Sequence, residues 1–152
     1  MTIDNIVDSV SYNGDVLDVQ GVLDNWRMEK TFNFITCDNN NPGDLVINGT
    51  DSNANNWCSN GGMILMCSAS DTTSPWHGFA SNDKEWVNNV DNSTLCTNED
   101  GFIAAAKRRN IGFIVDMLNN GASKIWADSR TVSLRGTPEV PGLVYQFLFR
   151  KI

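Results

Sequence analysis

The sequence is built from short runs of apolar or alternating apolar and polar residues, separated by turn residues. Such runs are typical of β-strands, because successive side chains of a strand point to opposite faces of a sheet. Many short strands at this spacing indicate a mainly β protein, with an antiparallel β-sandwich or β-barrel architecture. The predicted strands cover residues 6–12, 16–23, 31–36, 45–47, 63–67, 125–134 and 143–149.

Two of these runs make sharper predictions. Asn13-Gly14 interrupts an alternating pattern, and Asn-Gly between β-forming residues is the strongest short signal for a two-residue hairpin loop, because both positions need positive φ. The last run, residues 143–149, is apolar on both faces of the strand that it would form. It therefore predicts a central strand rather than a strand at the edge of a sheet.

The segment from residue 102 to residue 118 is ambiguous. Its apolar residues fall on one side of a helical wheel, and Asn120-Gly121 would supply a cap at the end of a helix. The same residues also fit a β-hairpin that turns at residues 107–110, and Gly112 weakens a helix by about 1 kcal/mol relative to Ala. A helix near 102–118 and a hairpin therefore stay open as alternatives.

The longest polar stretches lie between cysteines, from residue 37 to residue 67. They are rich in Asn, Asp, Ser and Gly, which favour turns because their side chains bond to nearby backbone or tolerate positive φ. The four cysteines, which include no C-x-x-C pair, are Cys37, Cys58, Cys67 and Cys96. Three of them lie beside polar residues, so we expect two disulfides and an oxidising compartment. Loops held on a rigid scaffold are where binding residues tend to lie.

Length and charge set the class of protein. We expect one domain over residues 1–152, since domains usually contain about 100–200 residues. No window approaches the length of a transmembrane segment, and the N-terminus lacks the pattern of a signal peptide. Through residue 100 there are fifteen acidic and three basic side chains, followed by three acidic and eight basic ones. An acidic chain repels phosphate, so we expect no nucleic-acid partner, and the basic cluster at 107–109 is too short to reverse this.

Two N-glycosylation sequons bear on the compartment. They are Asn48-Gly49-Thr50 and Asn92-Ser93-Thr94, and a sequon that is used lies on the surface of a secreted protein. Together with the cysteines they favour secretion. A cytosolic protein is the alternative that the N-terminus leaves open.

His77, the single histidine, is the first candidate for catalysis. As the base of a nucleophilic triad it would have Ser74, Asp71 and Asp83 as candidate partners. No G-x-S-x-G nucleophile elbow is present, and a loop histidine packed beside Trp76 is the simpler interpretation. Carboxylate pairs for glycoside hydrolysis occur anywhere in so Asp-rich a chain, which leaves a hydrolase open. We expect a binding protein without a cofactor rather than an enzyme.

The segment Asp38–Asp44 is the candidate for a metal site. It resembles part of a calcium-binding loop, with oxygen-bearing side chains at alternate positions and a glycine at the sixth. Pro42 interrupts the pattern, and Gly49 stands where a bidentate Glu would complete the loop. A plain turn is therefore the favoured interpretation, with calcium as its alternative.

Four of the five tryptophans lie in polar, turn-like surroundings. They are Trp26, Trp57, Trp76 and Trp86, whereas Trp126 lies in a predicted strand. Core packing accounts for such residues when each indole N–H finds a partner. Alternatively, a flat apolar ring beside Asn and Asp suits a sugar, whose C–H face stacks on the ring while its hydroxyls bond to amides and carboxylates. The predicted ligand-binding residues are Asn55, Asn56, Trp57, Trp76, His77, Asp83 and Trp86.

These observations lead to three hypotheses of function. The first is a lectin-like protein that binds a glycan through the loops around Trp57, Trp76 and Trp86. The second is a secreted toxin, elicitor or immune-active protein that engages a membrane or a cell-surface receptor, because exposed tryptophans also suit a bilayer interface. The third is a structural or assembly module, which a stable oligomer would favour.

Overall fold

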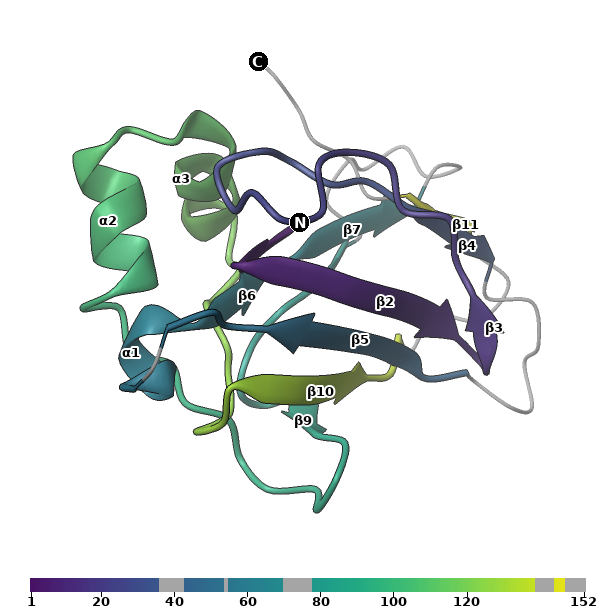
Figure 1. Ribbon diagram of the computed structural model, residues 1–152. Coiled ribbons are helices and arrows are strands. Elements are labelled where there is room, and N and C mark those ends of the chain that lie inside the picture. Colours follow the sequence, from purple (N-terminus) through teal and green to yellow (C-terminus); the bar gives the residue numbers. More distant parts are fainter. Residues whose placement is uncertain (36–42, 54, 70–77, 139–143, 147–152) are drawn as a thin grey trace.

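The computed structural model describes residues 1–35, 43–53, 55–69, 78–138 and 144–146, and for residues 35, 68, 69, 78 and 144–146 it describes the backbone alone. The fold is mainly β, as predicted (Figure 1). The strands are β1 (Thr2–Asp4), β2 (Ile6–Tyr12), β3 (Asp15–Val16), β4 (Asn33–Ile35), β5 (Leu45–Thr50), β6 (Gly62–Ile64), β7 (Met66–Ala69), β8 (Gly78–Ala80), β9 (Trp86–Asn88), β10 (Thr131–Gly136) and β11 (Val144–Gln146). The helices are α1 (Trp57–Asn60), α2 (Phe102–Arg108) and α3 (Gly112–Asn119).

The largest sheet is antiparallel and has the strand order β3-β2-β5-β10-β9. Its central strand β5 alternates as a half-buried strand should, with Leu45, Ile47 and Gly49 buried and the alternate residues partly exposed. Strand β2 buries Val7 and Val10, which are three residues apart, because the register shifts between Val7 and Ser9. This bulge keeps both valines on the core side of the sheet.

The predicted hairpin at Asn13-Gly14 is confirmed. Tyr12 pairs with Asp15 across the loop, which makes β2 and β3 neighbours. The φ angles of Asn13 and Gly14 are 51° and 85°, the positive values that this two-residue loop requires.

The predicted strand over residues 16–23 is shorter than expected, because β3 contains only its first residue. The chain then runs beside the outer side of β2 without forming a full ladder. Leu17 N donates to Val10 O at 2.8 Å, and Val7 N donates to Leu23 O at 2.9 Å. The segment is thus a loop that follows the strand.

A second sheet has the strand order β4-β11-β7-β8, and β1 pairs with β6 in a third, two-stranded sheet. Strand β11 lies between β4 and β7, so the prediction of a central strand near the end of the chain is confirmed. Strands β8 and β9 have only three residues each and had not been predicted. The mainly β class is established by these sheets, while the choice between sandwich and barrel stays a prediction.

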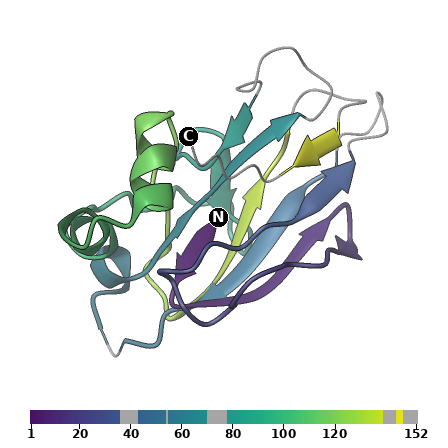
Figure 2. The ribbon, with the colours of Figure 1, turned by 90° about the horizontal axis from the view of Figure 1, so that it is seen from above.

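The ambiguous segment forms two helices, α2 and α3, and the hairpin alternative is wrong. The helices are separated at residues 109–111, where Asn110 has a φ of 52° and Ile111 is extended. Figures 1 and 2 show the three helices gathered at one end of the sheets. No helix among the described residues is long and apolar enough to cross a membrane. The residues that α2 and α3 bury are Phe102, Ile103, Ala106, Phe113, Ile114 and Met117.

Candidate functional site

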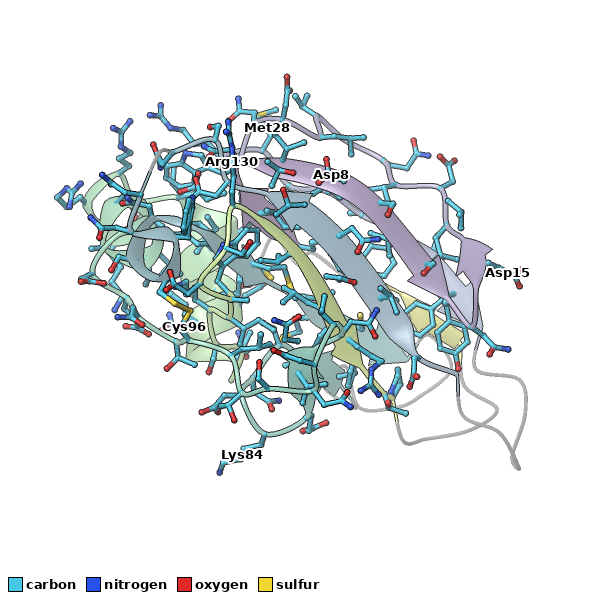
Figure 3. All side chains as sticks on the ribbon, turned by 60° about the horizontal axis from the view of Figure 1, so that its bottom comes forward. Asp8, Asp15, Met28, Lys84, Cys96 and Arg130 are labelled. Atoms are coloured by element: carbon cyan, nitrogen blue, oxygen red, sulfur yellow. A yellow bond between two sulfur atoms is a disulfide. The ribbon has the colours of Figure 1, made fainter. Side chains whose placement is uncertain are left out.

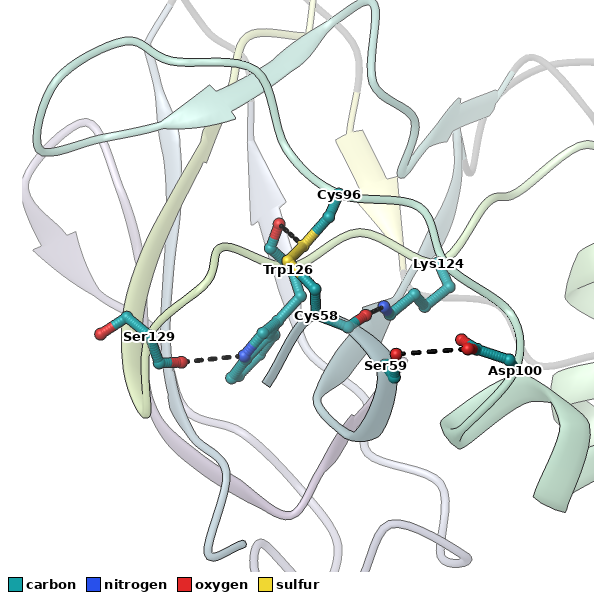
Figure 4. The surroundings of a disulfide bond; sticks show 7 residues. All are labelled: Cys58, Ser59, Cys96, Asp100, Lys124, Trp126 and Ser129. Carbon is teal, nitrogen blue, oxygen red and sulfur yellow. Dashed lines mark hydrogen bonds between the residues drawn. A yellow bond between two sulfur atoms is a disulfide. The ribbon is translucent and has the colours of Figure 1, made fainter. Parts of the chain in front are cut away.

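A disulfide between Cys58 and Cys96 defines the helical end of the molecule (Figure 4). It joins α1 to a chain segment that lies 38 residues later. The backbone of Cys96 forms a two-way bridge with Trp126, whose indole N–H donates to Ser129 O at 3.1 Å. The disulfide therefore connects α1 to a part of the fold that is already fixed by hydrogen bonds.

The expectation of two disulfides is wrong for Cys67. This residue is a free thiol, and it is fully buried in the core. Burial raises the pKa of the Cys67 thiol to about 12, because the thiolate loses its hydration there. Sequence neighbours misled the prediction, since only the packing of β7 decides which way this side chain points. Cys37 lies outside the described residues.

The polar segment before and within α1 forms a folded loop, here called the Trp57 loop (residues 51–53 and 55–60). Asn56 has a φ of 54° and a ψ of 45°, in the left-handed region that Asn tolerates better than most residues. The Trp57 indole N–H donates to Asn53 O at 3.2 Å, and the Asn60 side-chain amide donates to Asn55 O at 3.1 Å. The loop is thus closed by its own side chains.

Three predicted site residues are brought together on this loop. Asn55 and Asn56 are exposed, and Trp57 is half-buried, packed on one side against the core. The Trp57 N–H is already bonded within the loop, so the ring offers a partner its apolar surface rather than a donor. An apolar ring beside two solvent-facing amides is the arrangement that the sequence predicts for stacking on a sugar.

Two further polar side chains lie next to the Trp57 loop. Ser59 Oγ donates to Asp100 Oδ2 at 3.4 Å (Figure 4). Gly101 makes this approach possible, because a Cβ at that position would lie 2.1 Å from Ser59 O. The start of α2 therefore packs closely against α1, and the Asp100 carboxylate lies at the edge of the Trp57 loop.

Beneath the loop lies a buried charged cluster made of Asp4, Asp51 and Lys124. Their exposed fractions are 8%, 0% and 1%. Lys124 Nζ donates to Cys58 O (Figure 4), and Asp51 Oδ1 accepts a hydrogen bond from Asn53 N. Asp4 Oδ1 and Asp51 Oδ2 find no hydrogen-bond partner among the described atoms. The cluster holds both ends of the loop, at residue 51 and at α1.

Burial perturbs all three of these groups. It raises the pKa of Asp4 to about 7, with repulsion from Asp51 adding to the effect. It also raises the pKa of Asp51, although the hydrogen bond from Asn53 opposes the shift. It lowers the pKa of Lys124 to about 8, against the attraction of several carboxylates including Asp100. Each shift has the sign expected when water is removed from the charged form.

The remaining predicted residues do not join the Trp57 loop. Trp86 is fully buried, stacks on Phe79 with ring centroids 5.3 Å apart and donates its N–H to Ala80 O, so its ring is not exposed for stacking on a ligand. Asp83 is exposed in the turn before β9, and Figure 3 shows its neighbour Lys84 away from Cys96. The predicted residues Trp76 and His77 lie outside the described residues.

Most of the predicted calcium loop, residues 38–42, also lies outside the described residues. Its last member, Asp44, accepts a hydrogen bond from Thr137 Oγ1 at 2.6 Å and lies 3.8 Å from Arg135. Its carboxylate is therefore engaged by the β10 side of the sheet. Within the described part of the chain, no group of three His, Cys, Asp or Glu side chains could hold a metal ion.

No local pattern in the sequence indicates the buried cluster. Asp4, Asp51 and Lys124 come from β1, from the position directly after β5 and from the segment after α3, and only the fold brings them together. A comparison of the chain with protein-family models finds no match, and comparisons with curated proteins and with solved structures find no significant match.

Proposed function

We propose that the protein binds carbohydrate through the Trp57 loop and does so without catalysis. The observation that carries the proposal is the half-buried Trp57 ring flanked by the exposed amides of Asn55 and Asn56. A sugar ring stacks its C–H face on an indole, and its hydroxyl groups exchange hydrogen bonds with amide and carboxylate groups. Asp100 and Ser59 add polar groups at the edge of the same surface.

Rigidity of the loop supports the proposal. The disulfide, the bond from Lys124 to Cys58 O and the bond from Trp57 to Asn53 O hold the ring in place before a ligand arrives. A pre-organised site loses less conformational entropy on binding, which favours recognition of a small polar ligand. The disulfide also fits an oxidising compartment, so we place the protein outside the cytosol, as a secreted protein.

Binding is favoured over hydrolysis by the placement of the carboxylates. The one pair of described carboxylates that interact and have raised pKa values is Asp4 with Asp51. Both side chains are buried under the loop, where a glycosidic bond would not reach them. Asp100 reaches the surface, where it accepts a hydrogen bond from Ser59. Hydrolysis by two carboxylates needs both groups beside the scissile bond.

A glycan array tests the proposal with the purified wild-type protein and Trp57→Ala. We expect the wild type to bind a defined set of glycans, and Trp57→Ala to lose most of this binding while it stays folded, at a melting temperature lowered by the lost packing of the ring against the core. Trp57→Phe keeps a flat ring and should retain part of the binding. Asp83→Ala, on the far turn, is the matched control and should bind normally. A wild-type protein with no signal above background would overturn the proposal.

A second candidate function is contact with a membrane or receptor, and a specific surface favours it. Val22, Leu23 and Met28 are exposed on the loop between β3 and β4, and Met28 is labelled on this surface in Figure 3. Sedimentation with sugar-free liposomes separates the two candidates. Co-sedimentation that Leu23→Ser together with Met28→Ser abolishes would favour this loop, whereas a lectin should stay in the supernatant.

A further inference from the structure

Of the two N-glycosylation sequons, only one lies on an accessible turn. Residues 89–94, which include the sequon Asn92-Ser93-Thr94, are all exposed. They form a turn after β9 that is closed by its own backbone, since Asn92 N donates to Asn88 O at 2.8 Å and Asn88 N donates to Ser93 O at 3.0 Å. Asn92 has a φ of 58°, in the left-handed region that Asn tolerates in turns.

The other sequon lies inside the largest sheet. Asn48 is in β5, where its backbone is paired with Ser9 of β2 on one side and with Ser133 of β10 on the other. Its side-chain amide nitrogen donates to Ser9 Oγ at 2.8 Å. The third residue of this sequon, Thr50, donates its hydroxyl to Asp8 Oδ2 at 2.6 Å. A glycan on Asn48 would have to break the contact with Ser9 in the middle of a three-strand ladder.

From this difference we propose that Asn92 is an N-glycosylation site of the protein and that Asn48 is not. In the reaction, the Asn92 amide nitrogen forms a bond to the anomeric carbon of an oligosaccharide carried on a polyprenyl diphosphate. The bond from that carbon to the diphosphate breaks, the polyprenyl diphosphate leaves, and the amide nitrogen gives up one proton to a base of the transferase. The proposal goes beyond glycan recognition and depends on the same entry into the secretory pathway.

The contacts of Asn92 are compatible with this product. Arg135 donates a hydrogen bond to Asn92 Oδ1, the carbonyl oxygen, which keeps its acceptor role after the nitrogen has been modified. The amide nitrogen is the atom that must carry the sugar. Val90, two residues away, is 83% exposed, more than any other large apolar side chain that is described. A glycan at Asn92 would cover this apolar side chain.

The attached glycan would leave the Trp57 loop open. Arg135, which contacts Asn92, pairs with Val46 in the sheet, whereas Thr131 pairs with Thr50 next to the loop. These two positions are four residues apart on β10, or about 13 Å along the strand. Glycosylation and glycan recognition would therefore use opposite ends of the same strand.

The test is to pass the full chain, with an added secretion signal, through the secretory pathway of a eukaryotic cell and to map the product. After reduction, trypsin separates the two sequons, because cleavage at Lys30, Lys84 and Lys107 gives peptides 31–84 and 85–107. Treatment with a peptide N-glycosidase converts a glycosylated Asn to Asp, which mass spectrometry localises. We expect full removal of the glycan to mark Asn92 in peptide 85–107 and to leave peptide 31–84 unchanged.

Variants make the outcome decisive. Asn92→Gln should abolish the glycan, and Asn48→Gln, the matched control, should keep it. Thr94→Ala removes the sequon but retains Asn92 and its bond to Arg135, so it tests the site even where Asn92→Gln impairs secretion. A secreted wild-type protein that carries no glycan, or a glycan found on peptide 31–84, would overturn the proposal. Neither result depends on Trp57, so a failure here is distinct from a failure of carbohydrate binding.

Discussion

Two polar loops of this protein are each held by a buried lysine, but the two lysines are satisfied in different ways. Lys30 is completely buried and donates to Thr2 Oγ1 at 3.0 Å, to Met28 O at 2.6 Å and to Asn25 O. Lys124 is equally buried, but among the described residues it donates a hydrogen bond only to Cys58 O. Burial lowers the pKa of each ammonium group to about 8.

The two loops accommodate a buried ammonium group in different ways. An ammonium group has three donors and no acceptor, and a buried one is tolerated when neutral oxygens take those donors. The loop around Lys30 meets this condition and has no disulfide. The Trp57 loop does not meet it and has a disulfide instead. We infer that hydrogen bonds stabilise the first loop, whereas a covalent bond secures the second.

Replacement of the two buried lysines should change stability more than any other substitution in the two loops, and by different amounts. Lys30→Met leaves three acceptors without a donor, and we expect the free energy of unfolding to fall by about 4 kcal/mol. Lys124→Met leaves one such acceptor and should lower it by about 2 kcal/mol. Urea unfolding of the two variants beside the wild type measures both values. A larger loss for Lys124→Met would contradict the assignment of the main hydrogen-bonding role to Lys30.

Removal of the disulfide tests whether the covalent bond stabilises the Trp57 loop. The double change Cys58→Ser with Cys96→Ser opens a 38-residue connection, and we expect a loss of about 3 kcal/mol, mainly because the unfolded chain gains freedom. Amide hydrogen exchange should rise first at residues 55–60 and much less at residues 25–30. Reductant supplies the control, since it should destabilise the wild type and leave the double variant unchanged. Equal exchange in both loops would show that the disulfide has no local role.

The pH dependence of stability should arise in part from the cluster beneath the Trp57 loop. The pKa of Asp4 is about 7 in the folded protein and near 3.8 in an unfolded chain, so the folded state keeps a proton that the unfolded state releases. Stability should therefore fall as the pH rises from about 4 to about 7, by a few degrees in melting temperature. Asp4→Asn should flatten this slope. Burial also raises the pKa of Glu29, beside Lys30, to about 7, and Glu29→Gln is the matched variant for that loop.

Substitutions of Asn56 should have the smallest effect on stability, and they test whether its side chain belongs to the binding site. Asn56→Gly suits the positive φ of 54° and should leave stability within about 0.5 kcal/mol of the wild type, whereas Asn56→Ala should lower it by about 1 kcal/mol. Thermal unfolding measures both. If the amide contacts a sugar, both variants should bind glycans less well despite their different stabilities. Normal binding by Asn56→Gly would remove this side chain from the site.

What could be predicted from the sequence is the part that local chemistry decides. The hairpin at Asn13-Gly14 follows from backbone preferences of two residues, and the grouping of Asn55 with Trp57 follows from their nearness along the chain. The burial of Trp86 could not be predicted, because it depends on Phe79 and on Gly136, where a Cβ would lie 2.4 Å from the indole. Its polar sequence neighbours lie in a turn and say nothing about where the ring packs.

The same limit applies to the buried charges and to the helices. Asp4, Asp51 and Lys124 meet only because β1, β5 and the chain after α3 converge, and no spacing in the sequence encodes that meeting. Apolar periodicity made a helix over residues 102–118 one of two alternatives, but the choice against the hairpin and the break between α2 and α3 depend on packing and on the local conformation of Asn110 and Ile111. Contacts between distant segments therefore account for most of what was missed.

The loop that follows the outer side of β2 has a consequence for behaviour at high concentration. An uncovered outer strand presents amide and carbonyl groups that can recruit a strand of another molecule, which is a common start of aggregation. Here Val10 O and Val7 N are already occupied by Leu17 and Leu23, and the exposed charge of Asp8 lies at the bulge between these bonds. The segment between β3 and β4 thus covers this edge of the largest sheet and blocks the addition of a strand from another molecule there.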